Sequence, residues 1–148
     1  MLEFKQNLPF ADADGCYELL DGNRIPAIGF GTWRVKDRED GAAVCAEAIR
    51  AGYRHFDTAY LYGSEESVGD AIRASGIDRS EFFVTTKVWK DDLSAEGARL
   101  ELETSLSRLG MDYVDLLLIH WPRRDSEDPE WRERLTETWN AFQQFKRE

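Results

Sequence analysis

With 148 residues, of which 42% are hydrophobic and 12% aromatic, the chain has the composition of one folded domain, since disordered chains are poorer in apolar side chains. Its formal net charge of −10 at pH 7 argues against binding to nucleic acids, which requires a basic surface. No apolar run approaches the roughly 20 residues of a membrane-spanning helix, no secretory signal is visible at the start, and Cys16 and Cys45 form neither a disulfide framework nor a metal site. We therefore expect a cytoplasmic protein that binds small molecules, without nucleic-acid or membrane partners.

The first 33 residues predict an arm, a hairpin and a short strand. Residues 1–15 mix polar and apolar side chains without a period, and we expect them to form a loose N-terminal arm. Residues 16–28 contain two short extended pieces around an Asp-Gly-Asn turn, which is the pattern of a β-hairpin. Residues 29–33, GFGTW, are rich in glycine, which suits a first barrel strand whose backbone is closely approached by another group.

After the hairpin, helical and strand patterns alternate along the chain. Residues 37–52 predict a helix capped by Asp37. The core face expected for this helix carries Val44, Ala48 and Ala51. Residues 55–58 predict a buried strand, and residues 64–76, which begin with Ser64 and two acids, predict the next helix.

The last two strand and helix pairs follow in the same order. Residues 82–88 predict the third strand, and Ser94 is the expected cap of the helix after it. The core side of that helix is expected to carry Leu102, Leu106 and Leu109. Residues 113–121 predict the fourth strand, and Asp128-Pro129 marks the expected start of the last helix. One face of the last helix is expected to carry Trp131, Leu135, Trp139 and Phe142.

The alternation of strands and helices predicts an α/β fold. Nearly continuous apolar strands are typical of a parallel sheet that is buried on both faces, and connections of this kind are right-handed, so that the sheet curls. We therefore expect residues 16–148 to form the hairpin and the first four units of a parallel (β/α) barrel of the TIM type. Four units leave two strand edges unpaired, which favours self-association through those edges.

Four side chains at the ends of the predicted strands suggest a catalytic site. Asp57 lies at the end of the second strand with Tyr62 five residues later, Lys87 lies near the end of the third, and His120 near the end of the fourth. In a barrel of this type, catalytic groups lie at the carboxyl ends of the strands. Each residue alone also has an ordinary structural role, such as a surface charge or a core histidine, and only their coincidence points to catalysis.

The chemistry of these four groups is consistent with protonation of a carbonyl oxygen. A phenol has an ordinary pKa of about 10, and an ammonium such as that of Lys87 would favour its ionised form. Asp57 is the carboxylate available to pair with Lys87, and His120 can donate a hydrogen bond to a substrate oxygen. None of the residues is a convincing nucleophile, so the natural complement is hydride from a nicotinamide cofactor. Trp33 and Trp121 follow strand ends and could line an apolar substrate pocket.

Long motifs in the chain resemble the aldo-keto reductase family. The resemblance runs from about residue 17 to residue 148, through GNRIPAIGFGTW, AGYRHFDTAYLYGSEESVGDAI, FFVTTKVW and SLSRLGMDYVDLLLIHWP. It implies an eight-unit barrel preceded by a hairpin, and reduction of aldehydes and ketones, mostly with NADPH. It also implies roles for single residues. These are a catalytic tetrad of Asp57, Tyr62, Lys87 and His120 with Tyr62 as general acid, nicotinamide contacts at Gly31, Thr32 and Asp57, and a substrate pocket at Trp33 and Trp121.

The resemblance covers only the first half of the family barrel. Strands five to eight, the Ser-Asn pair for the carboxamide and the basic residues for the adenosine phosphate have no counterpart, so we expect a truncated chain that is inactive alone. Two alternatives stay open. One is a non-catalytic binding or structural protein on the same scaffold. The other is a Schiff-base aldolase that uses Lys87, against which the spacing of Asp57 and Tyr62 argues.

Overall fold

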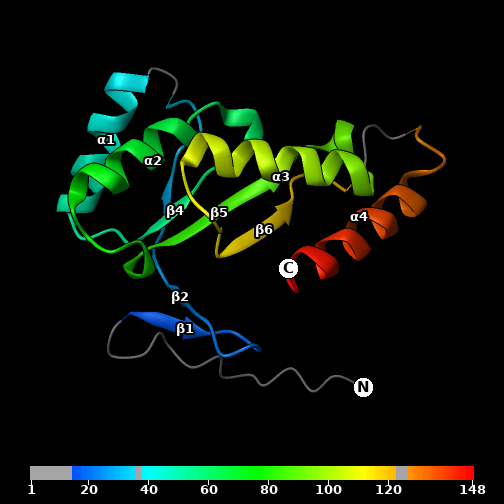
Figure 1. Cartoon of the computed structure of the whole chain (residues 1–148), viewed down its shortest axis with the longest axis horizontal. Helices are drawn as coiled ribbons and strands as arrows, with labels where there is room; N and C mark the ends of the chain where they lie inside the picture. Colours follow the sequence, from blue (N-terminus) through cyan, green and yellow to red (C-terminus); the bar gives the residue numbers. More distant parts are fainter. Residues whose placement is uncertain (1–14, 36–37, 123–126) are drawn as a thin grey trace.

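A computed structural model describes residues 15–35, 38–122 and 127–148, and shows a hairpin followed by one parallel sheet (Figure 1). The predicted arm lies outside the described residues, apart from residue 15. The hairpin consists of β1 (Cys16–Glu18) and β2 (Arg24–Pro26), which pair antiparallel. The sheet has the order β3-β4-β5-β6 and consists of β3 (Phe30–Gly31), β4 (His55–Asp57), β5 (Phe83–Val88) and β6 (Leu116–Ile119), with each neighbouring pair parallel. The prediction of a hairpin and four parallel strands is confirmed.

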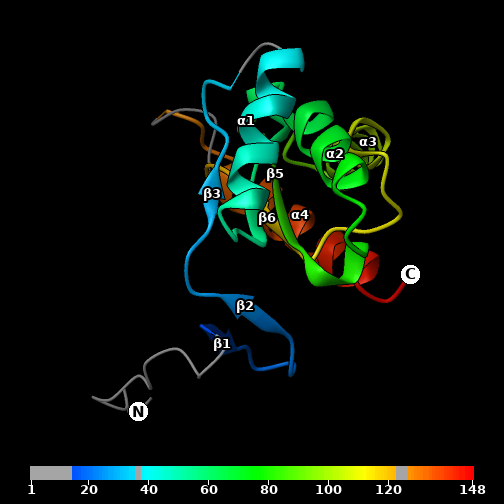
Figure 2. The same ribbon diagram turned by 90° about the vertical axis from the view of Figure 1, so that its left-hand side faces the viewer.

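Three helices cover one face of this sheet. They are α1 (Arg38–Arg50), α2 (Glu65–Ser75) and α3 (Ala95–Leu109), and α4 (Trp131–Phe145) packs against α3. Figures 1 and 2 show α1, α2 and α3 side by side over the strands, whereas the hairpin extends away from them. Helices α1, α2 and α3 each connect one strand of the sheet to the next, and α4 follows β6, as in a barrel of βα units.

The strand register determines which side chains meet the helices. Phe56 lies opposite Val84, and both are fully buried in the core beneath α1 and α2. Because side chains alternate along a strand, Asp57, Lys87 and Leu118 point to the other face. Leu118 lies opposite Lys87 and is 36% exposed. On this second face Phe83 and Thr85 of β5 are also buried, so the expectation of a sheet buried on both faces is confirmed at β5 but not at Leu118 of β6.

The expected helix faces are confirmed in part. In α1, Ala48 is buried as predicted, but the core includes Cys45 and Ile49 while Val44 is exposed. Ala51 lies beyond the end of α1 and is also exposed, and Asp37 lies outside the described residues. The buried face of α1 is rotated by about one residue from the predicted face because it packs against both α2 and the sheet. The periodicity of a single helix does not reveal which neighbours it packs against.

In α3 and α4 the faces are also turned from the prediction. Leu109 is buried, but Leu102 and Leu106 are only half-buried, and the other buried positions of α3 are Ala98, Glu101 and Ser105. Helix α4 begins at Trp131, two residues after the predicted first helical residue, because Asp128 accepts a hydrogen bond from the Glu130 amide and forms a turn first. Phe142 is buried, whereas Trp139 is exposed.

The helix ends follow the sequence signals closely. The Ser94 hydroxyl accepts a hydrogen bond from the Gly97 amide at 2.9 Å, which is the predicted N-terminal cap of α3. Helix α3 ends at Gly110, whose φ of +63° favours glycine. Gly69 permits close packing of α2 on α3, since a Cβ atom there would lie 2.0 Å from the Leu109 carbonyl oxygen. The predicted fourth strand is shorter than expected and spans Leu116–Ile119.

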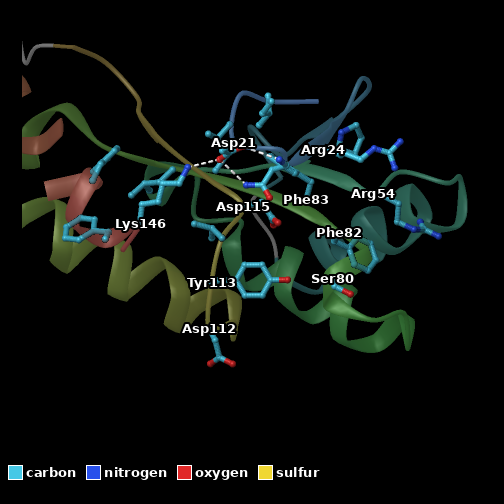
Figure 3. A pocket seen from close by; sticks show the side chains of 18 of the residues that line it. Asp21, Arg24, Arg54, Ser80, Phe82, Phe83, Asp112, Tyr113, Asp115 and Lys146 are labelled. Carbon is cyan, nitrogen blue, oxygen red and sulfur yellow. Dashed lines mark hydrogen bonds and ion pairs between the residues drawn. The ribbon is translucent and has the colours of Figure 1, made fainter. Parts of the chain in front are cut away.

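A groove lies at the amino ends of the strands. It is lined by the hairpin, the start of β5, the segment before β6, α3 and α4 (Figure 3). Phe83, Tyr113 and Asp115 contribute to its wall. The ion pair between Lys146 and Asp21, at 2.7 Å, connects the end of α4 to the turn of the hairpin across this groove.

Candidate active site

Asp57 and Lys87 form an ion pair between two neighbouring strands. Asp57 is the last residue of β4, and Lys87 is the last but one of β5. The Lys87 Nζ atom donates to Asp57 Oδ1 at 2.5 Å and to the Thr58 carbonyl oxygen at 2.8 Å. The Lys87 side chain is 11% exposed and that of Asp57 is 38% exposed. The ammonium is therefore nearly removed from water, and two acceptors compensate for its lost hydration.

Tyr62 lies directly above this ion pair. It ends a 3₁₀ helix, Tyr60–Tyr62, that follows β4, and Gly63 reverses the chain there with a φ of +70°. The Lys87 ammonium is 4.9 Å from the centre of the Tyr62 ring. A cation at this distance stabilises the negative charge that a phenol acquires when it gives up its proton.

His120 completes the group of four. It follows β6 directly, and its amide donates to the Val88 carbonyl oxygen at 2.9 Å. The Nε2 atom lies 3.3 Å from the Tyr62 hydroxyl, while Nδ1 is buried and has no partner among the described residues. Burial, and secondly the charge of Lys87, lower the pKa of His120, although Asp57 acts in the opposite direction. The ring is thus neutral at pH 7 and carries one N–H.

Aromatic rings border the four residues on two sides. The Trp33 ring contacts the Tyr62 ring edge to face at a centre distance of 4.8 Å, and Trp89 contacts His120 in the same manner at 5.2 Å. Trp33 and Trp121, the two predicted pocket residues, are both more than half exposed. Trp89 was missed, although its place directly after a strand, like those of Trp33 and Trp121, was a signal in the sequence.

A cluster of buried hydroxyl groups supports the site from behind. The Ser64 hydroxyl lies 2.8 Å from that of Thr32 and 3.2 Å from that of Thr58, and all three residues are fully buried. The Thr32 amide also donates to the Asp57 carbonyl oxygen at 3.0 Å. Ser64 precedes α2 but makes no capping hydrogen bond with its side chain, because its hydroxyl is used in this cluster. The cluster joins the ends of β3 and β4 to the start of α2.

The three predicted cofactor positions differ in accessibility. A Cβ atom added at Gly31 would meet nothing within 4 Å, so this residue borders open space, and it lies opposite Asp57 in the sheet. Thr32 is buried with its hydroxyl turned to Ser64 and to the Asp57 carbonyl oxygen. Gly31 therefore borders open space beside the partly exposed Asp57 carboxylate, and Thr32 supports Asp57 through its main-chain carbonyl.

The arrangement offers a proton donor, a neutral imidazole and an ammonium at one open end of the sheet. Such a set suits the protonation of an oxygen atom on a small molecule. Among residues 15–35, 38–122 and 127–148, no group of three His, Cys, Asp or Glu side chains could hold a metal ion. Within the same ranges, each helix is too short or too polar to cross a bilayer.

Comparisons with known proteins agree on one family. Residues 27–148 match the model of the aldo/keto reductase family. A 9,11-endoperoxide prostaglandin H2 reductase of Trypanosoma cruzi is 42% identical over 130 residues, which are 88% of this chain and 43% of that protein.

Two solved structures are similar in fold and in sequence. An aldo/keto reductase from Brucella melitensis has a TM-score of 0.81 and 45% identity, over 89% of this chain and 49% of that one. An aldo-keto reductase from Bombyx mori in complex with NADP has a TM-score of 0.74 and 40% identity, over 87% and 45%. The chain spans less than half the length of these three relatives.

Proposed function

Because the chain belongs to the aldo/keto reductase family, we propose that it carries the acid–base part of the active site of an NADPH-dependent carbonyl reductase. The substrates are small aldehydes or ketones, and the location is cytoplasmic. The observation that supports this proposal most strongly is the convergence of four groups from three strand ends. Lys87 bonds to Asp57 at 2.5 Å beneath Tyr62, whose hydroxyl lies 3.3 Å from His120.

Each of the four residues has a distinct role in the proposed reaction. A bound nicotinamide would supply the hydride that adds to the carbonyl carbon. The Tyr62 hydroxyl gives its proton to the carbonyl oxygen, so that the product is an alcohol, and the tyrosinate regains a proton from solvent. Lys87 stabilises the tyrosinate by its charge, and Asp57 holds Lys87 in place. The N–H of His120 donates to the same carbonyl oxygen and orients it.

The environment of the four residues also has a role. Gly31 and Asp57 are the residues that would border the nicotinamide, with Thr32 behind them. The rings of Trp33 and Trp89 flank Tyr62 and His120 and would shield the reacting oxygen from water. Trp121 would extend the same wall toward the substrate.

The geometry of Lys87 disfavours the aldolase alternative. A Schiff base requires an amine that is free to attack a carbonyl carbon, whereas the Lys87 Nζ atom is engaged with Asp57 and the Thr58 carbonyl oxygen. The intact set of four residues also favours an enzyme over a purely structural protein.

The 148-residue chain by itself is expected to reduce carbonyls at a negligible rate. Trp33 and Trp121 are more than half exposed and Asp57 is 38% exposed, so the place where the carbonyl group would react is open to water, which weakens the electrostatic interactions there. Within the described residues, β3 and β6 each have one edge without a neighbouring strand, and these edges are expected to make copies of this chain associate.

A test of the proposal is Tyr62→Phe in a barrel that is completed with the C-terminal half of a relative such as the Brucella melitensis protein. General acid catalysis typically contributes about 10²–10⁴-fold, so NADPH-dependent reduction of an aldehyde should fall by that factor while NADPH binding stays unchanged. Tyr60→Phe, in the same 3₁₀ helix, is the matched control and should retain activity. A Tyr62→Phe variant with more than about a tenth of the wild-type rate would refute the role of general acid.

A further inference from the structure

The segment that follows β5 is held from behind by a side chain of α3. Trp89 is the first residue after β5, and its ring contacts His120. The Trp89 amide donates to Glu101 Oε2 at 2.7 Å. Glu101 lies in the middle of α3 and is 3% exposed. A buried carboxyl group on the helix layer thus determines where the main chain of Trp89 lies.

Further carboxyl groups surround Glu101. Asp92 lies in the 3₁₀ helix Lys90–Asp92, and its carboxyl group approaches that of Glu101. Glu65, at the start of α2, is fully buried and accepts from the Thr86 hydroxyl at 2.7 Å. Glu65 is also paired with Arg108, whose Nη1 atom lies 3.4 Å from Glu65 Oε2.

The negative charges of the neighbouring carboxyl groups favour the protonated form of Glu101. Arg108 is paired with Glu65, whereas Glu101 is 3% exposed and has no cation paired with it among the described residues, and an uncompensated carboxylate in the interior is highly unfavourable. The Glu101 Oε1 atom is buried and has no partner among the described residues, so a proton on Oε1 could be donated to Asp92. Burial in the first place, and then Asp92 and Glu65, raise the pKa of Glu101 to about 8, against the opposing effect of the Trp89 amide.

We propose that Glu101 is a positioning residue that, as a neutral carboxylic acid, holds the Trp89 segment and keeps the Trp89 ring against His120. Its Oε2 atom accepts from the Trp89 amide, and its Oε1–H donates to Asp92. Ionisation of Glu101 would place a third negative charge beside Glu65 and Asp92 and would loosen the segment. The role of Trp89 as a wall of the substrate pocket rests on the proposed reductase function. The hydrogen bond between Glu101 and the Trp89 amide does not depend on that function.

The test uses nuclear magnetic resonance of the 148-residue chain, without substrate or cofactor. The amide resonance of Trp89 should shift with pH in the wild type, with a midpoint near 8. Glu101→Gln should abolish this shift and keep the contact, because its amide oxygen accepts from Trp89 and its NH₂ group donates to Asp92. Glu101→Leu should lose the acceptor, and hydrogen exchange of the Trp89 amide should become at least about tenfold faster.

Glu103→Gln is the matched control, since Glu103 lies on the same helix with a side chain that is 64% exposed. It should change neither the titration nor the exchange rate of Trp89. A midpoint near the ordinary carboxyl pKa of 4.5, or wild-type exchange protection in Glu101→Leu, would overturn the proposal. If Glu101→Leu does not fold, the comparison of wild type with Glu101→Gln decides. Because no turnover is measured, a failure here is distinct from a failure of the reductase assignment.

Discussion

The two ends of the parallel sheet differ in how firmly their parts are held. At the carboxyl end, the hydroxyl cluster of Thr32, Thr58 and Ser64 is fully buried, and Lys87 bonds to two acceptors. At the amino end, the hairpin extends away from the helices (Figure 2). Leu20 and Ile28 are highly exposed there, and a groove lies between the hairpin and the sheet (Figure 3).

The difference between the two ends shows which side chains of the site are held in position by contacts within this chain. The side chains at the carboxyl end are positioned by buried partners within these residues. The ion pair between Lys146 and Asp21 that connects the amino end is exposed, and pairs of that kind contribute little to stability because water and salt screen them. The positions of the acid–base groups are therefore fixed by contacts within the described residues. The amino end of the sheet is held less firmly.

The largest expected effect concerns Lys87 and Tyr62 as one unit. In the completed barrel, Lys87→Met should lower the rate of carbonyl reduction by about 10²–10⁴-fold, because it acts through the same phenol as Tyr62→Phe. The double variant should be no slower than roughly the worse single one. Lys90→Met serves as a control near the end of the same strand, and additive losses in the cycle would show that the two residues act separately.

A second prediction concerns the pH dependence of stability. The folded-state pKa of Glu101, about 8, lies above the value of 4.5 for the free group, so its contribution is fully present below pH 4.5 and is lost as the pH rises through 8. Urea denaturation should show a free energy of unfolding that falls by a few kcal/mol between pH 5 and pH 9. Glu101→Gln should flatten this fall. An equal fall in Glu101→Gln would assign the pH dependence to other groups.

A third, smaller effect compares the two ends of the sheet directly. Ser64→Ala leaves the Thr58 hydroxyl buried without this partner, and should lower the free energy of unfolding by about 1–3 kcal/mol. Lys146→Ala at the amino end should leave the urea midpoint nearly unchanged. If Lys146→Ala were the more damaging of the two, the amino end would be the more firmly held part.

Much of this architecture could be predicted from the sequence. Three apolar runs in the sequence each have one polar residue near the end, which predicts strand ends at Asp57, Lys87 and His120. Parallel strands bring these ends to one edge of the sheet. The faces of α1 and α4 could not be predicted, because Val44 and Trp139 are apolar yet turn away from the core. The periodicity of a helix indicates how wide its apolar face is. Which part of that face is buried depends on the neighbouring helices.

The supporting residues were the hardest to predict. Glu65 and Glu101 are buried acidic side chains, and residues of this type are almost never fully buried unless they have partners. Their partners, Arg108, Thr86 and the Trp89 amide, lie on other elements. No local pattern in the sequence predicts contacts between such distant residues, so they are seen only in the tertiary structure.

The most direct test of this account compares NADPH binding and aldehyde turnover in the 148-residue chain with those in the completed barrel. The chain alone should bind NADPH too weakly to measure at micromolar concentration and show no turnover, even though light scattering should find it associated. The completed barrel should approach the usual enzyme turnover of about 10 s⁻¹, and Tyr62→Phe should abolish that activity. Submicromolar NADPH affinity with comparable turnover in the chain alone would contradict the account, because it would show that these residues build a whole site without further cover.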